Sequence, residues 1–255
     1  MEYVKFLIKI FEEHSMIEPG GVPDFFRISP PEDIQRERFT EGGEVYFGKP
    51  GSVWGEQSPL TAKKVHKFFS GGKLPIIFDL GGGDGRHTPL LKSIAKIVIP
   101  LDADPSALWK NRSDNRSGVQ PVVADFTEEF PIISEGVDAV FSAATLHLFS
   151  PARFDKISKE IDRITKPNGK LFLDFSYDIN RVYIQTGAPK PLIFGDEKHL
   201  NREETIVLLK EPFPSFDITF EEGDAINRTF NDVVEPYKIT CKSLLVMGIK
   251  RKKSL

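Results

Sequence analysis

The stretch Ile76-Ile77-Phe78-Asp79-Leu80-Gly81-Gly82-Gly83-Asp84-Gly85 decides the fold. An apolar run ends in an acid, and the loop that follows has a glycine at every second position. Continuous hydrophobicity bounded by glycines is typical of a strand buried on both faces of a parallel sheet. The glycines permit a tight turn and the close approach of a ligand, and the helix expected from His87 would direct its N-terminus at that ligand.

The spacing of the glycines separates this loop from the dinucleotide-binding fingerprint G-x-G-x-x-G. Counted from Gly81, Arg86 stands at the third glycine position, and counted from Gly83, Thr88 stands there. This departure argues against a nicotinamide-dependent oxidoreductase. The loop instead has the pattern D-x-G-x-G-x-G, formed by Asp79, Gly81, Gly83 and Gly85. A glycine-rich loop alone is weak evidence for function, so the rest of the chain has to support it.

Composition limits the classes of protein to which the chain can belong. A length of 255 residues, of which 40% are hydrophobic and 28% charged, fits one sizeable α/β domain with additions. The net charge of −3 gives no electrostatic argument for nucleic acid or an anionic membrane. A single cysteine, Cys241, excludes an intramolecular disulfide and a zinc site with several cysteines. Since we find neither a signal peptide nor a membrane-spanning run, we expect a cytoplasmic protein.

Strands and helices alternate along residues 74–176, which predicts βαβ units and a parallel sheet with right-handed crossovers. The expected strands are Leu74–Leu80, Lys96–Leu101, Val119–Ala124, Val137–Ser142 and Lys170–Phe175. The expected helices are His87–Ala95, Asp104–Trp109 and Ser150–Lys166. Residues 177–200 break this alternation and are predicted to form an irregular insertion. After them we expect a helix opened by the capping box Asn201–Glu204, and then two last strands, Phe216–Phe220 and Ser243–Lys250.

Residues 1–70 are predicted to form an N-terminal segment with three helices, the third beginning at Ser58-Pro59. The part from Gly42 to Gly55 combines many glycines with aromatic side chains, which is typical of a mobile lid. Tyr46 and Trp54 are therefore candidates for contact with a substrate under that lid. An equally weighted alternative is that these aromatic residues only attach the N-terminal segment to the core.

Three acids, Asp79, Asp102 and Asp125, follow three consecutive predicted strands. In a doubly wound sheet, ligands bind outside the carboxyl ends of the strands, near the point where the strand order reverses. Asp102 lies 21 residues after Gly81, where an acid can accept the protons of two ribose hydroxyls. Acids at strand ends are also common helix caps, but three of them in register with one glycine loop favour a shared site.

With these residues in place, the stretch from about 74 to 176 resembles the Rossmann-type class I S-adenosylmethionine-dependent methyltransferases, especially the small-molecule group of UbiE-like and TehB-like enzymes. Asp79–His87 is similar to their motif I, Leu101–Leu108 to the second motif and Ala124–Phe126 to the third. Ile161–Leu171 resembles the segment around their Lys-Pro-Gly-Gly turn, with Asn168 in place of the first glycine. The resemblance implies a doubly wound, Rossmann-like α/β fold. Residues 71–255 would form a seven-stranded mixed sheet with an antiparallel last strand, and residues 1–70 an N-terminal helical cap.

The resemblance also implies the cofactor S-adenosyl-L-methionine, with S-adenosyl-L-homocysteine as the product. On the methionine side, Gly81, Gly83 and Gly85 would let the backbone reach the ligand. Asp79 would orient the ammonium group, and Ser142 would line this part of the pocket. These roles are implied by the match to the family's motifs.

On the adenosine side, the resemblance assigns four residues. Asp102 would accept the ribose hydroxyls, with Ala103 beside the adenine. Asp125 would accept from the adenine amino group, with Phe126 flanking the ring. No residue pattern predicts a metal site.

Methyl transfer from a sulfonium is an in-line displacement, in which holding the reacting atoms in near-attack geometry contributes up to about 7–11 kcal/mol. A general base is needed only where the nucleophile holds a proton that it cannot lose unaided. His147, which follows the fourth strand, is the candidate base, and a structural histidine at a helix start is the alternative.

The sequence after the fourth strand also bears on the acceptor. No Asn/Asp-Pro-Pro-Tyr/Phe sequence stands there, which argues against amino methylation of bases in nucleic acid. We therefore expect a small-molecule acceptor, no nucleic-acid or membrane partner, and a monomer or homodimer. The alternative function is a non-catalytic cofactor-binding module or the partner subunit of a methyltransferase complex.

Overall fold

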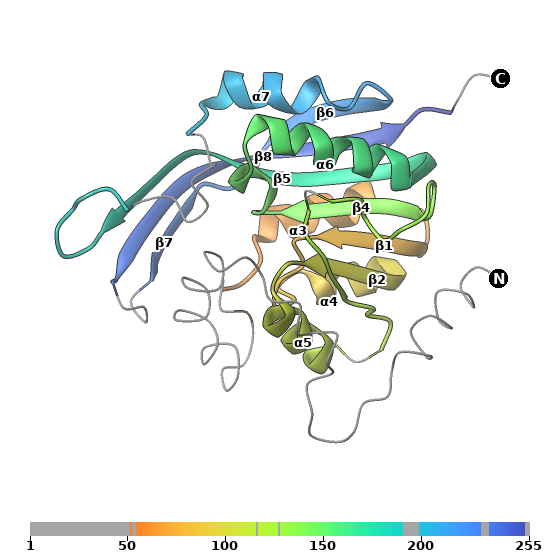
Figure 1. The fold of residues 1–255 in the computed structure, drawn as a ribbon, viewed down its shortest axis with the longest axis horizontal. Coiled ribbons are helices and arrows are strands. Elements are labelled where there is room, and N and C mark those ends of the chain that lie inside the picture. The colour runs from red at the N-terminus through yellow and green to blue at the C-terminus, as the bar shows by residue number, and fades with distance from the viewer. Residues whose placement is uncertain are drawn as a thin grey trace.

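A computed structural model of the chain describes residues 52, 55–115, 117–126, 128–190, 199–230 and 235–252 (Figure 1). The first two predicted helices, the candidate lid residues Tyr46 and Trp54, and residues 191–198 lie outside the described residues. No helix within the described ranges is long and apolar enough to cross a membrane.

Eight strands of the described chain form one mixed sheet in the order β3-β2-β1-β4-β5-β8-β6, with β7 paired to β8. Strands β1 to β5 run parallel, whereas β8 runs antiparallel to β5, β6 and β7. The Rossmann-like doubly wound sheet with antiparallel last strands is therefore confirmed, with one strand more than expected. The strands are β1 Leu74–Leu80, β2 Ala95–Asp102, β3 Val122–Val123, β4 Val137–Ala143, β5 Thr165–Tyr183, β6 Phe216–Glu222, β7 Ile226–Phe230 and β8 Tyr237–Lys250.

The helices begin where their capping residues predict. Ser58 accepts a hydrogen bond from the Thr61 amide, and Asp104 accepts from two amides at the start of its helix. Asn201 and Glu204 form the complete predicted capping box. The helices are α3 Pro59–Phe68, α4 Thr88–Ile94, α5 Pro105–Asp114, α6 Pro151–Ile164 and α7 Arg202–Lys210, with a 3-10 turn, η2, at Leu146–Leu148.

Helices cover both faces of the sheet, as a buried parallel sheet requires. On one face, α6 buries Phe154, Ile157 and Ile161 in a cluster that also contains side chains of β1, β4 and β5. On the other face, α3 and α4 pack against side chains of the same strands. Figure 1 shows α6 lying along the sheet. The two layers hold the strand ends, and the loops that follow them, in fixed positions.

Strand β5 continues to Tyr183, so the prediction that an irregular insertion begins at residue 177 is wrong for residues 177–183. Past a register shift between Tyr177 and Asn180, β5 pairs with the start of β8, which in turn pairs with β7. A bulge of this kind bends a strand and interrupts its alternation of apolar and polar residues, which explains the wrong prediction. Because β4 ends at Ala143, opposite Asp174, this part of β5 extends beyond the parallel strands. We call residues 179–183, 226–230 and 237–241 the outer ribbon.

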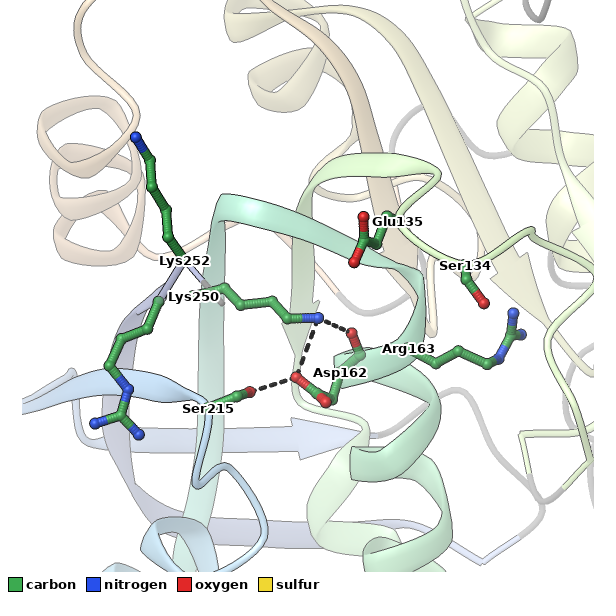
Figure 2. A pocket seen from close by; sticks show the side chains of 8 residues that line it. Ser134, Glu135, Asp162, Arg163, Ser215, Lys250 and Lys252 are labelled. Atoms are coloured by element: carbon green, nitrogen blue, oxygen red, sulfur yellow. Dashed lines mark hydrogen bonds and ion pairs between the residues drawn. The ribbon is translucent and has the colours of Figure 1, made fainter. Parts of the chain in front are cut away.

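At the amino-terminal edge of the sheet, Lys250 fixes the end of α6 (Figure 2). Its buried ammonium donates to the carbonyl oxygens of Asp162 and, at 2.9 Å, Thr165, and pairs with the Asp162 carboxylate at 3.2 Å. A cation is favourable here because the last carbonyls of a helix carry partial negative charge. The hollow of about 340 Å³ beside Lys250, into which Ser134 and Glu135 also project, is at the edge opposite the glycine loop.

We expect Lys250→Met to lower the free energy of unfolding by about 2 kcal/mol, because it removes the charged donor from buried oxygens. The midpoint of urea unfolding measures this change. Lys252→Met, which removes the same charge at an exposed position near the same hollow, is the matched control and should leave the midpoint unchanged. Equal midpoints for the two variants would contradict a capping role for Lys250.

Candidate active site

The glycine loop leaves β1 at the point where the strand order reverses, between β1 and β4. The amides of Gly81 and Gly82 donate to the Leu101 carbonyl at 2.8 and 3.2 Å, which extends the β1–β2 ladder into the loop. Gly81, Gly83 and Gly85 have φ values of +79°, +46° and +91°. These left-handed conformations favour glycine and account for its recurrence at every second position.

The three glycines differ in what surrounds them. A Cβ added to Gly81 would lie 2.1 Å from the Thr145 hydroxyl oxygen, and one added to Gly85 would lie 2.6 Å from Asn111 Oδ1. A Cβ added to Gly83 would meet no atom of the described residues closer than 3.9 Å. Gly81 and Gly85 are thus required by packing, whereas the backbone at Gly83 borders open space into which a ligand can fit.

Asp79, the last acid of β1, is 2% exposed, and its Oδ2 atom has no hydrogen-bond partner among the described residues. Burial raises the pKa of this carboxyl to about 7, the negative charge of Asp102 adds to the rise, and Arg86 opposes it. A buried carboxyl without a partner is expected to attract a cationic group. The ammonium group of an amino-acid ligand would satisfy this requirement.

Asp102 ends β2 next to the loop and is 9% exposed. Its Oδ2 accepts from the Gly83 amide at 3.1 Å, and its Oδ1 accepts from the Asp104 amide at 3.0 Å. Carboxylate oxygens carry two lone pairs each, so such a group has the chemistry to accept hydroxyl protons as well as backbone amides. The hydrogen bond from the Asp104 amide also fixes the start of α5, because Asp104 is the N-cap of this helix.

The other predicted cofactor residues lie at neighbouring positions along the same edge. Asp125 is exposed just after β3, whereas Phe126 is 7% exposed and packs edge-to-face against Phe149 at 5.5 Å. Ala103 is half-buried between Asp102 and the start of α5. Ser142 is buried and donates to the Leu80 carbonyl at 2.8 Å, which ties β4 to β1 at the loop. The roles predicted for these residues toward a cofactor stay predictions.

His147 lies in η2, after β4, and is 7% exposed. Burial lowers the pKa of its imidazole to about 3, and the positive charge of Arg181 lowers it further. The ring is therefore neutral at pH 7 and binds a second proton poorly. Its Nδ1 atom has no hydrogen-bond partner among the described residues.

A polar cluster that the sequence did not reveal lies beside the glycine loop. The Nε–H of Arg86 donates to His87 Nε2 at 3.1 Å, and burial, followed by the charge of Arg228, lowers the pKa of the Arg86 guanidinium. Arg86 also interacts electrostatically with Asp84 and Asp174. The presence of Arg86 next to the loop is visible in the sequence. Its proximity to Arg228 depends on the pairing of β7 with β8, which no local pattern predicted.

The segment that leads into α3 crosses this cluster. Ser52 donates to Asp84 Oδ1 at 2.6 Å, Thr61 donates to Asp174 Oδ2 at 2.7 Å, and Arg228 donates to the Glu56 carbonyl at 2.9 Å. Residues on both sides of the candidate lid residue Trp54 are thus placed beside the glycine loop.

Comparison with known proteins relates the part of the chain that contains this site to methyltransferases. Residues 78–173 match a family described as a methyltransferase domain. An uncharacterized methyltransferase-like protein of Schizosaccharomyces pombe is 36% identical over 104 residues, which cover 38% of this chain and 37% of that relative. The chain therefore aligns with little more than a third of this relative's length.

Solved structures share the fold at low sequence identity. A SAM-dependent methyltransferase of Methanosarcina mazei superposes with a TM-score of 0.57 at 16% identity, covering 78% of this chain and all 100% of that one. The structure of a DhpI–SAH complex has a TM-score of 0.54 at 16% identity, with 76% of this chain and 84% of that chain covered. These likenesses show that the sheet order and helix layers belong to the methyltransferase fold.

We expect Asp79→Asn to stabilise the protein increasingly as the pH rises. Because the folded-state pKa of Asp79 lies above its ordinary value of 3.8, ionisation costs stability between about pH 4 and 7, and the cost is constant above that range. The Tm of Asp79→Asn relative to wild type should rise by several degrees between about pH 5 and pH 8. Asp155→Asn, on the exposed face of α6, should follow the wild type, and parallel curves for Asp79→Asn would contradict the assigned burial cost.

We expect Gly81→Ala to reduce mainly stability and Gly83→Ala to reduce mainly ligand affinity. The methyl group at Gly81 collides with Thr145, so this variant should have a lower Tm. The methyl group at Gly83 enters open space, so this variant should keep more of its stability and lose affinity for a ligand that lies against the loop. Thermal unfolding combined with titration of S-adenosylhomocysteine measures both effects, and normal affinity in Gly83→Ala would exclude this face of the loop as the binding site.

Proposed function

We propose that the protein is a class I S-adenosylmethionine-dependent methyltransferase that acts on a small-molecule acceptor. The observation that carries the proposal is the open backbone at Gly83, next to the Asp102 carboxylate and close to the unpartnered carboxyl oxygen of Asp79. The methyltransferase-domain match and the solved DhpI–SAH complex support S-adenosylmethionine as the cofactor.

The residues present fit this cofactor. Asp79 would hold the ammonium group, because a cation compensates a buried carboxylate. Asp102 would accept the ribose hydroxyls through its carboxylate oxygens, and Ala103, Asp125 and Phe126 would surround the adenine. When bound, the cofactor supplies a methyl group activated by a sulfonium. Ser142 and Gly81 keep the loop in place through their contacts with Leu80 and Thr145.

In this proposal the chain accelerates transfer mainly by positioning. An in-line displacement needs the acceptor atom aligned with the methyl group, and this alignment contributes up to about 7–11 kcal/mol. His147 is a weak candidate for the general base. Its imidazole has a pKa of about 3 and is therefore too weakly basic to take up a proton readily at neutral pH. Its unprotonated nitrogen is suited to accept a hydrogen bond from an acceptor hydroxyl.

The finer features of the function are part of the same proposal. They are membership of the UbiE-like and TehB-like small-molecule group, a cytoplasmic location, and a monomeric or homodimeric state. The alternative, a non-catalytic cofactor-binding module or partner subunit, shares the cofactor site, and no observation favours it. Turnover of labelled methyl groups on a small acceptor distinguishes the two.

The test is calorimetric titration of the purified protein with S-adenosylhomocysteine. Wild type should bind with micromolar affinity, and Asp102→Ala should bind about 10- to 100-fold more weakly, because hydrogen bonds to a charged group are lost. NADH is the ligand control, and Asp155→Ala is the protein control, since it removes an acid from an exposed helix face. Absence of binding to folded, ligand-free wild type would contradict the proposed cofactor and leave only the fold.

A further inference from the structure

Two arginines lie in one row across the outer ribbon. Arg181 of β5 and Arg228 of β7 are both paired with Ile239 of β8. Directly opposed residues of an antiparallel sheet project from the same face, and adjacent strands are about 4.8 Å apart. The Cα atoms of the two arginines are therefore about 10 Å apart on one face. Arg181 is 6% exposed and Arg228 is half-buried.

This face is close to the carboxyl edge of the parallel strands, where the candidate active site lies. The charge of Arg228 acts on Arg86 and His87, which follow the glycine loop, and in both cases it adds to the effect of burial. The charge of Arg181 acts in the same way on His147, which follows β4. Arg228 thus lies close to the residues that follow the glycine loop, and Arg181 close to the residue that follows β4.

The region gathers charges of both signs, because Arg228 and the carboxyls of Asp174, Asp84 and Asp79 all act on Arg86. Arg86 and Arg228 repel each other, and the repulsion lowers the pKa of Arg86 beyond the effect of burial. Burial raises the pKa of Asp174, whose carboxylate accepts hydrogen bonds from the hydroxyls of Thr61 and Ser243. The carboxyl that acts most strongly on Arg86 therefore holds its proton more readily than an exposed one and is bound by hydroxyl groups.

A buried donor without a partner is also part of the region. Because His87 Nε2 accepts from Arg86 and the pKa of this ring is well below 6.5, the imidazole is neutral and its proton is on Nδ1. This N–H is in a residue that is 8% exposed, and it has no acceptor among the described residues. Buried donors in folded proteins are almost always paired, so this donor favours a ligand with acceptor oxygens.

We propose that the methyl acceptor carries an oxyanion, a carboxylate or a phosphate, which Arg228 and Arg181 bind from the outer ribbon. A guanidinium presents its donors in a planar fork that matches the oxygens of both groups. An oxyanion between the two arginines would also relieve the repulsion between Arg228 and Arg86. The inference rests on the proposed function and names the class of substrate for the same site.

The experiment measures ligand binding to the protein saturated with S-adenosylhomocysteine, by calorimetry. The three probes each contain a phenyl ring and differ in the group attached to it. They are benzoate, phenyl phosphate and the neutral benzamide. At least one anion should bind about tenfold or more tightly than benzamide, the low end expected for a charge-assisted hydrogen bond. The better of the two anions identifies the carboxylate or the phosphate as the recognised group.

Three variants locate the effect. Arg228→Gln should reduce the preference for the anion to within about twofold, and Arg228→Lys should retain part of it, because the charge remains without the planar fork. Lys238→Gln is the matched control, because Lys238 is exposed on the same ribbon, opposite Thr229 and Val182, on the other face. It removes the same charge and should leave the preference intact. Affinity for S-adenosylhomocysteine should be unchanged in Lys238→Gln, and all variants are compared at saturating S-adenosylhomocysteine.

The outcomes separate this inference from the proposed function. Absence of S-adenosylhomocysteine binding to the wild type would overturn the proposed function itself. Normal S-adenosylhomocysteine binding, with anions that bind no better than benzamide or with no probe bound, would overturn the oxyanion inference alone. An equal loss in Lys238→Gln and Arg228→Gln would do the same, because it would show a general charge effect instead of a site.

Discussion

The junction at Gly81 holds together the three strands on which the candidate active site depends. Its amide continues the ladder to Leu101 of β2, and the Thr145 side chain after β4 occupies the space where a Cβ would lie. Ser142 adds a hydrogen bond from β4 to the carbonyl of Leu80. Because these contacts meet at Leu80 and Gly81, the loop emerges from β1 in a single defined direction. The positions of Asp79 and Asp102 follow from that direction.

Placing these two acids together has an energetic consequence. Asp79 is buried beside the charge of Asp102, and its pKa of about 7 means that its ionised form costs stability at neutral pH. A chain selected for stability alone would have an amide or an apolar residue there. The arrangement becomes favourable once a cationic group lies against Asp79. The burial of Asp79 beside Asp102 is therefore an argument for a ligand with a positive charge on this side.

Much of the cofactor side could be predicted from the sequence, because local patterns determine it. The buried strand before Asp79, the alternating glycines, and the caps at Ser58, Asp104 and Asn201 are all set by residues a few positions apart. Asn168, which stands in place of the first glycine of the turn, has the left-handed conformation that glycine favours, with φ +60°, within the first residues of β5. The outer ribbon could not be predicted, because a bulge disrupts the alternation of β5 and because β7 is defined only by its pairing with a distant strand.

The distinction between the cofactor side and the outer ribbon also applies to the comparison with known proteins. The methyltransferase-domain match ends at residue 173, before the outer ribbon begins, so similarity to that family concerns the cofactor side alone. We propose that recognition of the acceptor falls to β5, β7 and β8, whose long-range pairing brings Arg181 and Arg228 into one row. A sheet of this order can keep one cofactor site and change its acceptor through the strands added at its edge. The chemical identity of the acceptor therefore has to be sought in the charges of the ribbon and not in the glycine loop.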